Sequence, residues 1–392
     1  MTRLPAADWT SRADLAGLVA ALGPERMRWV GGAVRDTLLG TPVKDIDAAT
    51  TLPPVEVLAA LKAAGVRTVP TGIAHGTVTA VLPEGPVEIT TLRRDVATDG
   101  RRATIAFTTD WREDAARRDF TINALYAHPH TLEIADYFGG LADLADKRVR
   151  FIGDAGARIR EDHLRILRYY RFQARFGAVV DAEAEAACAA LAPTLRGLSR
   201  ERVAGELLAL LALPDPAPAV GRMAAAGILR EVLPEALPDG PAALAALRRV
   251  ERDQDAAPEA LRRMAALLPR DARLADQVAA RLRLSTAQRR HLVLLARHAG
   301  APEPAAALAY RLGPEVARDL LLLDGRPTAP LAGWQAPVLP VRGGDIVARG
   351  IAAGPEVARL LQAVERRWIG EGFPDRERVE ALLAEEMARQ ID

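Results

Sequence analysis

The chain has 392 residues, of which 49% are hydrophobic, and a formal net charge of +1. That length predicts two to four domains, and the hydrophobic fraction can fill a real core. The near-zero charge excludes an overall field that attracts nucleic acid, so RNA or DNA contacts must come from a local patch. The single Cys188 excludes a disulfide framework and a cysteine-based zinc site.

The sequence carries no signal-peptide pattern and no apolar run long enough to span a bilayer, so we expect a cytoplasmic protein without membrane contact. Nearly all positive charge is arginine, whose planar fork of donors suits phosphates and base edges. Hydrophobic periodicity predicts helices over 12–22, 33–39 and 55–64 and strands over 27–30, 66–69, 77–82 and 87–92.

Two adjacent glycines, Gly31 and Gly32, follow the first predicted strand. Their backbone can approach a ligand without a Cβ clash. They also open the predicted helix over 33–39, and unpaired N–H groups at a helix start favour a phosphate. Arg35, one turn into that helix, adds a positive charge for the same anion.

Asp45 and Asp47 carry the next feature. Lys44-Asp45-Ile46-Asp47 alternates as a strand does, which places both carboxylates on one face and Ile46 on the other. Adjacent carboxylates repel unless a cation lies between them, and an oxygen-only pair suits Mg²⁺. A phosphate cradle followed by paired carboxylates indicates phosphoryl or nucleotidyl transfer by a two-metal mechanism. The alternative is a βα turn followed by a charged strand edge.

Each of two later segments has two possible interpretations. Glu88, on the predicted strand over 87–92, is either a third carboxylate near Asp45 and Asp47 or a solvent-facing position. Residues 95–106 are polar and rich in arginine, with Asp99 and Arg101 near the centre. This composition predicts a loop, either mobile with a function or simply solvated.

A short helix is predicted over 114–125 (DAARRDFTINAL). On it, Arg117 and Arg118 would point about 100° apart, and Asp119 and Asn123 would share a face. Two arginines beside an aspartate and an asparagine suit a triphosphate and a ribose. The alternative is a surface helix with ion pairs.

The composition changes near residue 150. Residues 136–153 (DYFGGLADLADKRVRFIG) predict a strand, a glycine turn and a return to strand, and helical periodicity rich in Ala, Leu and Arg follows to the end. The expected fold class is an α+β head with a mixed sheet and flanking helices, followed by an elongated all-α arm. We divide it into a head (1–150), a helical neck (151–213), a helical body (214–323) and a helical tail (324–392).

The first long helix of the arm is predicted over 157–176, with Asp162 and Arg165 on one face. An intrahelical ion pair is one interpretation. The other is base selection, because a carboxylate accepting from an amine beside a guanidinium donating to a ring nitrogen matches the edges of cytosine and adenine. Uracil and guanine present the reverse pattern, which leaves buried polar groups unpaired.

Further arginines lie along the arm. The pairs Arg248-Arg249, Arg262-Arg263, Arg289-Arg290 and Arg366-Arg367 are either solvated faces or contacts to a sugar-phosphate backbone. Ser199 is expected to cap a helix over 201–213, and Ser285 with Gln288 forms a predicted capping box.

The order of these motifs resembles the bacterial and eukaryotic class of tRNA nucleotidyltransferases, the CCA-adding enzymes of the polymerase-β-like superfamily. The segments that carry the resemblance are GGAVRDTLLG with KDID, RRDFTINAL, DYFGGLADL, EDHLRILR and SRERVAGEL, within the first half of the chain. Bacterial poly(A) polymerases share these motifs, so the resemblance fixes the branch of the superfamily better than the substrate.

The resemblance implies that Asp45 and Asp47 are the catalytic residues and hold two Mg²⁺ ions. It places Gly31, Gly32, Arg35, Arg117, Asp119 and Asn123 near the triphosphate and sugar of the nucleotide. It makes Asp162 and Arg165 the protein template for CTP and ATP. The segment around Asp99 and Arg101 resembles the flexible loop linked to the switch from C to A addition.

The reaction implied is attack of the 3′-hydroxyl of tRNA on the α-phosphate of CTP or ATP, with release of pyrophosphate. We expect tRNA as the partner and a monomer or homodimer. The alternatives are a bacterial poly(A) polymerase and a non-catalytic RNA-binding module with the same fold.

Overall fold

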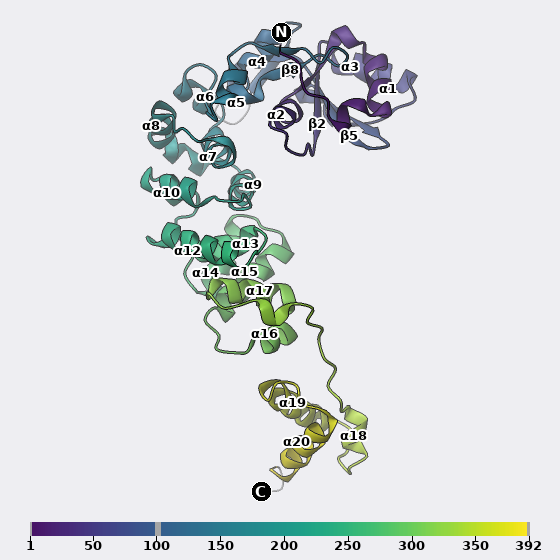
Figure 1. Ribbon diagram of the computed structural model, residues 1–392, viewed down its shortest axis with the longest axis vertical. Coiled ribbons are helices and arrows are strands. Elements are labelled where there is room, and N and C mark those ends of the chain that lie inside the picture. The colour runs from purple at the N-terminus through teal and green to yellow at the C-terminus, as the bar shows by residue number, and fades with distance from the viewer. Residues whose placement is uncertain (1, 99–102, 390–392) are drawn as a thin grey trace. The chain divides into compact units, whose positions relative to one another are not determined.

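The computed structural model describes residues 2–98 and 103–389. Asp99 and Arg101, which we assigned to a flexible loop, lie outside these described residues. The chain divides into two compact units, residues 1–234 and 235–392, and the described strands belong to the first unit (Figure 1). The α+β head with a helical remainder is thereby confirmed, and the finer division at residues 150, 213 and 323 stays a prediction.

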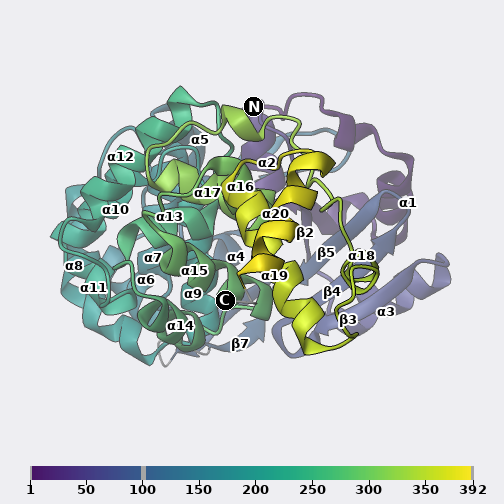
Figure 2. The ribbon, with the colours of Figure 1, turned by 90° about the horizontal axis from the view of Figure 1, so that it is seen from below.

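A seven-stranded mixed sheet lies in the first unit, in the order β3-β4-β5-β2-β1-β8-β9. Strands β2 and β5 pair in parallel, whereas the other neighbouring strands pair antiparallel. Figure 2 shows β2, β5, β4 and β3 side by side. The strands are β1 (Met27–Val30), β2 (Ile46–Thr50), β3 (Arg67–Gly72), β4 (Thr77–Leu82), β5 (Gly85–Thr91), β8 (Leu125–Ala127) and β9 (Ile134–Asp136). The strands predicted over 27–30, 66–69, 77–82 and 87–92 are confirmed.

The three helices predicted near the sheet are also confirmed. They are α1 (Ala13–Leu22), α2 (Gly32–Leu38) and α3 (Pro54–Ala63). Helices α1 and α3 pack together, α3 contacts β3 and β4, and α2 contacts β1, β2 and β8. Gly31 has φ of 69°, a left-handed conformation that favours glycine, and it turns the chain from β1 directly into α2.

The loop predicted over 95–106 is wrong for residues 95–98 and 103–106, the parts of it that the structure describes. Strands β6 (Arg93–Thr98) and β7 (Ala103–Phe107) pair antiparallel as a separate two-stranded sheet. The arginine and aspartate content concealed a β-branched pattern, because Val96, Thr98, Thr104 and Ile105 all favour extended backbone.

The single helix predicted over 114–125 is also wrong. Helix α4 (Trp111–Ala116) ends before the arginine pair, and a 3-10 turn, η4 (Thr121–Asn123), leads into β8. Phe120 is extended and forms an isolated bridge with Phe151. Tertiary pairing of a buried aromatic residue therefore overrides the helical pattern.

The return strand predicted after Asp136 is replaced by helix α5 (Gly140–Ala145). The Asp136 carboxylate accepts hydrogen bonds from the backbone N–H groups of Phe138, Gly140 and Leu141 at 2.9–3.2 Å. These bonds satisfy N–H groups at the start of the helix, which have no partner within it. The carboxylate thus turns the chain into a helix where we expected a strand.

The helix predicted over 157–176 is two helices, α6 (Ala155–Glu161) and α7 (Arg165–Phe176). The chain is extended at Asp162, with φ of −149° and ψ of 106°, and its carboxylate accepts from the backbone N–H of Leu164 at 3.1 Å. Aspartate competes with helical hydrogen bonding in this way. Asp162 and Arg165 therefore do not share a helix face, and that prediction is wrong.

Aromatic side chains fasten α7 to the head. The ring of Phe120 lies 5.3 Å from that of Phe172, and Phe151 stacks on Tyr169 at 5.7 Å between centroids. Each such pair contributes roughly 0.5–1.5 kcal/mol beyond its buried area. This packing fixes the arginine-rich face of α7 relative to the segment around Asp119.

The other helices are as follows. The first unit continues with α8 (Ala182–Leu191), α9 (Arg200–Leu211), capped by Ser199 as predicted, α10 (Ala217–Ala225) and α11 (Ile228–Val232). The second unit contains α12 (Gly240–Asp253), α13 (Ala260–Leu267), α14 (Ala272–Arg281), α15 (Thr286–His298), α16 (Ala305–Leu312), α17 (Pro314–Leu323), α18 (Gly343–Val347), α19 (Pro355–Gly370) and α20 (Arg376–Ala388). The predicted capping box of Ser285 and Gln288 begins α15. None of the helices in the described residues combines the length and apolar character that a membrane crossing needs.

One arginine pair of the second unit is neither a solvated face nor an RNA contact. Arg262 and Arg263 are 3% and 0% exposed, and both donate to the carboxylate of Glu251. Arg262 also pairs with Asp319 at 2.7 Å, and Arg248 pairs with Glu251 at 2.6 Å. Both interpretations offered for Arg262-Arg263 are therefore wrong, because buried charges require partners and these carboxylates supply them.

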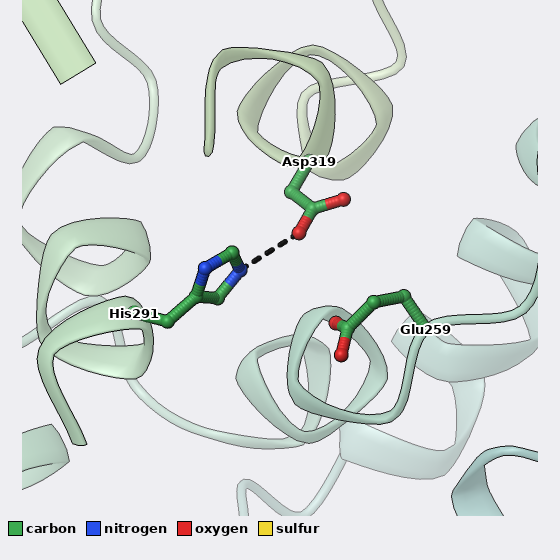
Figure 3. A group of neighbouring side chains, drawn as sticks. All are labelled: Glu259, His291 and Asp319. Atoms are coloured by element: carbon green, nitrogen blue, oxygen red, sulfur yellow. Dashed lines mark hydrogen bonds and ion pairs between the residues drawn. The ribbon is translucent and has the colours of Figure 1, made fainter. Parts of the chain in front are cut away.

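His291 joins this network at its edge (Figure 3). Its Nε2 lies 2.8 Å from Oδ2 of Asp319, and the carboxylate of Glu259 lies opposite, with the ligand-type atoms of all three residues within 4.8 Å of one another. Glu259 accepts from the backbone N–H groups of Leu261 and Arg262 and so caps α13. Both carboxylates thus have hydrogen-bond partners within the protein.

We expect His291 to stabilise the protein more at pH 6 than at pH 8.5. The hydrogen bond that His291 donates to Asp319 raises the pKa of His291 against the opposing effect of burial, and the carboxylates of Glu259 and Glu315 add to the increase. A histidine whose pKa is higher in the folded than in the unfolded protein stabilises the fold. The stabilisation is complete below the unfolded pKa of about 6.5 and is lost as the pH rises through the pKa of the folded protein. Urea midpoints of wild type and His291→Gln should therefore differ more at pH 6. Equal differences at both pH values would contradict the assignment.

Candidate active site at the glycine turn and the paired aspartates

Strand β2 brings the predicted carboxylates together. Ile46 is 6% exposed and packs in the core, while Asp45 and Asp47 line one cavity. Asp47 lies directly opposite Glu88 in the parallel register of β2 and β5. Residues opposite each other in neighbouring strands share a face of the sheet, so the three carboxylates converge.

The electrostatics of Asp47 fit a cation site. Burial, followed by the negative charge of Glu88, raises the pKa of Asp47 to about 6, although the charge of Arg118 lowers it; Asp45 adds a smaller increase. Carboxylates that repel in this way are relieved by a divalent cation with oxygen ligands. The donor set therefore fits Mg²⁺.

The start of α2 faces the same cavity. Gly32 and Arg35 line it, and the guanidinium of Arg35 pairs with Asp36 at 2.8 Å and donates to the side-chain oxygen of Asn123. The guanidinium also lies over the ring of Phe176, 4.5 Å from its centroid. These contacts fix a positive charge one turn from the glycine pair, as the sequence predicted.

The cavity has a volume of about 560 Å³, and its lining includes four cationic side chains beside the carboxylates. Lys44 contributes from the head, and Arg171 and Arg175 contribute from α7. We did not single out Arg171 or Arg175. Their spacing of four residues on a helix was the available signal, because it places both on one face.

Asp119 and Asn123 meet although the helix that we predicted for them does not exist. Asn123 donates to Asp119 at 3.0 Å across the η4 turn, and Arg168 pairs with Asp119 at 2.6 Å. Asp119 is buried, which raises its pKa, but the charge of Arg168 and the hydrogen bond from Asn123 outweigh burial and hold the pKa below its usual range. Asp119 is therefore negatively charged, and its carboxylate joins Asn123 of the head to Arg168 of α7.

The two adjacent arginines have different positions. Arg118 lies beside the glycine turn, since its Nη1 is 3.6 Å from where a Cβ on Gly31 would lie, and its charge acts on Asp47. Arg117, the residue that we named, instead pairs with Asp114 at 2.7 Å, and its carbonyl accepts from Arg165. The sequence pattern suited both arginines to a triphosphate, whereas the family resemblance named only Arg117, and only tertiary packing separates the two neighbours.

Arg165 and Asp162 are each held by other partners. Arg165 is 9% exposed and donates to Glu161 at 2.6 Å and to the carbonyl of Arg117 at 2.7 Å. Asp162 pairs with Arg202 of α9 at 2.7 Å. Neither is among the residues that line the 560 Å³ cavity. The base-selecting role assigned to them stays a prediction.

The fold and this site define a nucleotidyltransferase head. The sequence profile of the poly A polymerase head domain matches residues 27–150, and that of the probable RNA- and SrmB-binding site of polymerase A matches residues 179–239. The first match includes the glycine turn, the aspartates and the arginine pair, and the second begins in the first unit and ends five residues beyond it.

Relatives define the family more narrowly. The chain is 34% identical to CCA tRNA nucleotidyltransferase 1, mitochondrial, of Mus musculus over 88% of this chain and 83% of that protein. It is 43% identical to the CCA-adding enzyme of Leuconostoc citreum over 47% of this chain and 45% of that protein. The crystal structure of the Bacillus stearothermophilus CCA-adding enzyme in complex with CTP superposes with a TM-score of 0.74 at 28% identity, covering 96% of this chain and 98% of that one. The chain belongs to the family of CCA-adding tRNA nucleotidyltransferases.

Proposed function

We propose that this protein adds C and A nucleotides to the 3′ end of tRNA, using CTP and ATP and releasing pyrophosphate. The observation that carries the proposal is one cavity lined by Asp45 and Asp47 together with Gly32 and the cationic residues Arg35, Lys44, Arg171 and Arg175, with Glu88 next to Asp47 in the neighbouring strand. Paired carboxylates facing fixed positive charges suit a magnesium-bound triphosphate. The assignment of tRNA, CTP and ATP as substrates is supported by 34% sequence identity to a CCA tRNA nucleotidyltransferase, in an alignment that covers 88% of this chain.

We propose that Asp45 and Asp47 hold two Mg²⁺ ions, with Glu88 as a third carboxylate beside them. When bound, Mg²⁺ lowers the pKa of the attacking hydroxyl and neutralises charge on the leaving group. Arg35, with Gly31 and Gly32, contacts the phosphates, and Asp119 with Asn123 contacts the sugar. The protein supplies orientation and charge, and no side chain acts as a nucleophile.

Base selection is proposed for Asp162 and Arg165. The guanidinium of Arg165 is already oriented by Glu161 and by two backbone carbonyls, those of Arg158 and Arg117. A donor held in this way does not adapt to a base that presents another donor, so a mismatched base leaves it unpaired. In this proposal Arg117 helps to orient Arg165, because its backbone carbonyl accepts a hydrogen bond from that guanidinium.

Extension of a tRNA that lacks its last three nucleotides tests the function. With labelled CTP and ATP we expect three additions and then a stop, and chelation of divalent cations with EDTA should remove the activity until Mg²⁺ is restored. A long A tail would identify a poly(A) polymerase instead. No incorporation with any nucleotide, despite tRNA binding, would identify an RNA-binding module.

Two further assignments are proposals of the same kind. We propose tRNA as the macromolecular partner of a monomer or homodimer. We also keep the cytoplasmic location expected from the sequence as a proposal, although one relative named above is a mitochondrial protein.

A further inference from the structure

We propose that Asp114 and Tyr126 are positioning residues that hold the guanidinium of Arg118 beside Gly31 and Asp47, where it meets the phosphates of the incoming nucleotide. Neither residue touches the reacting atoms, and each acts through Arg118. The inference rests on the proposed function, because it assigns a nucleotide to the cavity beside the glycine turn.

Asp114 is a buried carboxylate surrounded by donors. It is 1% exposed and accepts from Arg117 at 2.7 Å, from Arg118 at 3.3 Å and from the hydroxyl of Tyr126 at 2.7 Å. Its spacing of three and four residues from the two arginines brings both guanidiniums to it where α4 ends. The backbone N–H of Arg93, the first residue of β6, donates to it as well.

Tyr126 provides the second support for Arg118. Its hydroxyl donates to Asp114 and accepts from Nε of Arg118 at 3.0 Å. Arg118 thus uses Nε for Tyr126 and Nη2 for Asp114, while Nη1 makes neither bond and lies toward Gly31. The two anchors fix the plane of the guanidinium and leave one edge directed at the glycine turn.

The register of the sheet explains why these anchors lie next to the catalytic carboxylates. Tyr126 on β8 is directly opposite Val30 on β1, and Val30 is directly opposite Asp47 on β2. Glu88 on β5 continues the same row. Directly opposed residues share a face, so the tyrosine and the two acids project from one face of the sheet. Arg118 donates to Tyr126 at one end of this row, and its positive charge acts on Asp47 two strands away.

Fixing an arginine before the ligand arrives has a physical advantage. A long side chain loses rotamer freedom on binding unless it is ordered beforehand. Hydrogen bonds to Tyr126 and Asp114 order Arg118 in the absence of nucleotide. The expected role is therefore tighter binding of CTP and ATP alike, since both carry the same triphosphate.

The substitution Tyr126→Phe tests the inference, because it removes one oxygen and keeps the ring. We expect KM for CTP and for ATP to rise about tenfold, the scale of one hydrogen bond to a charged group, with kcat nearly unchanged. Arg118→Lys should raise KM as well, and adding Tyr126→Phe to it should cause no further loss. A merely structural role would lower the active fraction, and thus the apparent kcat, at constant KM.

Tyr137→Phe is the matched control. Tyr137 has an edge-to-face contact with the ring of Tyr126 at 6.1 Å and lies in the same part of the head, so the control removes a similar hydroxyl. It should leave KM and kcat unchanged. Melting temperatures of all variants show whether the fold is kept, and Arg118→Lys keeps the test available if Tyr126→Phe is unstable.

Direct binding of CTP without RNA separates this inference from the proposed function. Isothermal titration with CTP and Mg²⁺ should give a dissociation constant about tenfold weaker for Tyr126→Phe. If the wild type binds CTP but does not extend tRNA, the proposed function fails and the comparison of variants still applies. Equal dissociation constants for the wild type and Tyr126→Phe overturn the inference.

Discussion

Replacing Asp47 with asparagine should abolish nucleotide addition while the protein remains folded. Asp47 lines the cavity together with Asp45 and lies directly opposite Glu88 in the neighbouring strand. Loss of one carboxylate weakens the magnesium site, and metal ions supply several kcal/mol of transition-state stabilisation, so kcat should fall by about 10³-fold or more. Single-turnover incorporation of labelled CTP into truncated tRNA measures the effect.

The melting temperature of the Asp47→Asn variant shows whether a loss of activity comes from unfolding. Because the folded pKa of Asp47 is raised to about 6, its charged form is unfavourable in the fold at neutral pH, and the loss of that charge should keep or raise the melting temperature without metal. Asp8→Asn, at an exposed position away from the cavity, should retain activity. Near-normal turnover by Asp47→Asn would remove the metal assignment.

Replacing Arg165 with alanine should relax the choice of nucleotide. The guanidinium is held by Glu161 and by two backbone carbonyls, so it presents a rigid donor. A site built to hydrogen-bond one pattern rejects the opposite pattern by orders of magnitude, and we expect the preference for CTP over UTP to fall by about 10²-fold. The ratio of kcat/KM for the two nucleotides on one tRNA acceptor measures this.

Arg160→Ala is the matched control for that experiment, because Arg160 is an exposed arginine of the preceding helix α6. It should leave the CTP preference intact. The Arg165 variant should keep the fold, since Phe120, Phe151 and Tyr169 still fasten α7 to the head. Unchanged rejection of UTP by Arg165→Ala would refute the base-selecting role.

Local patterns predicted the elements around the catalytic carboxylates. The alternation in Lys44-Asp45-Ile46-Asp47 placed Ile46 in the core and the acids in one cavity. The capping boxes and caps at Ser285 and Ser199 were equally visible, because a cap involves neighbours only a few residues apart. Such features depend on short-range geometry that the order of residues contains directly.

Patterns failed where distant residues compete with a local preference. Asp162 interrupts the expected helix while its carboxylate pairs with Arg202, forty residues later in the chain. Asp136 forms a cap for α5 where a glycine pair suggested a hairpin. In each case the aspartate side chain forms hydrogen bonds to backbone N–H groups or to an arginine, and the spacing of apolar residues does not predict such bonds.

The sequence by itself determined the nucleotidyltransferase head, the glycine turn and the paired aspartates, because each follows from residue type and short spacing. Tertiary structure alone decided that Arg118 rather than Arg117 lies at the glycine turn, and that Arg171 and Arg175 line the same cavity as the aspartates. It also decided that Arg262 and Arg263 are buried with Glu251. The reason is that a charged side chain takes its place from the partner it finds in space, and here those partners come from other helices and strands.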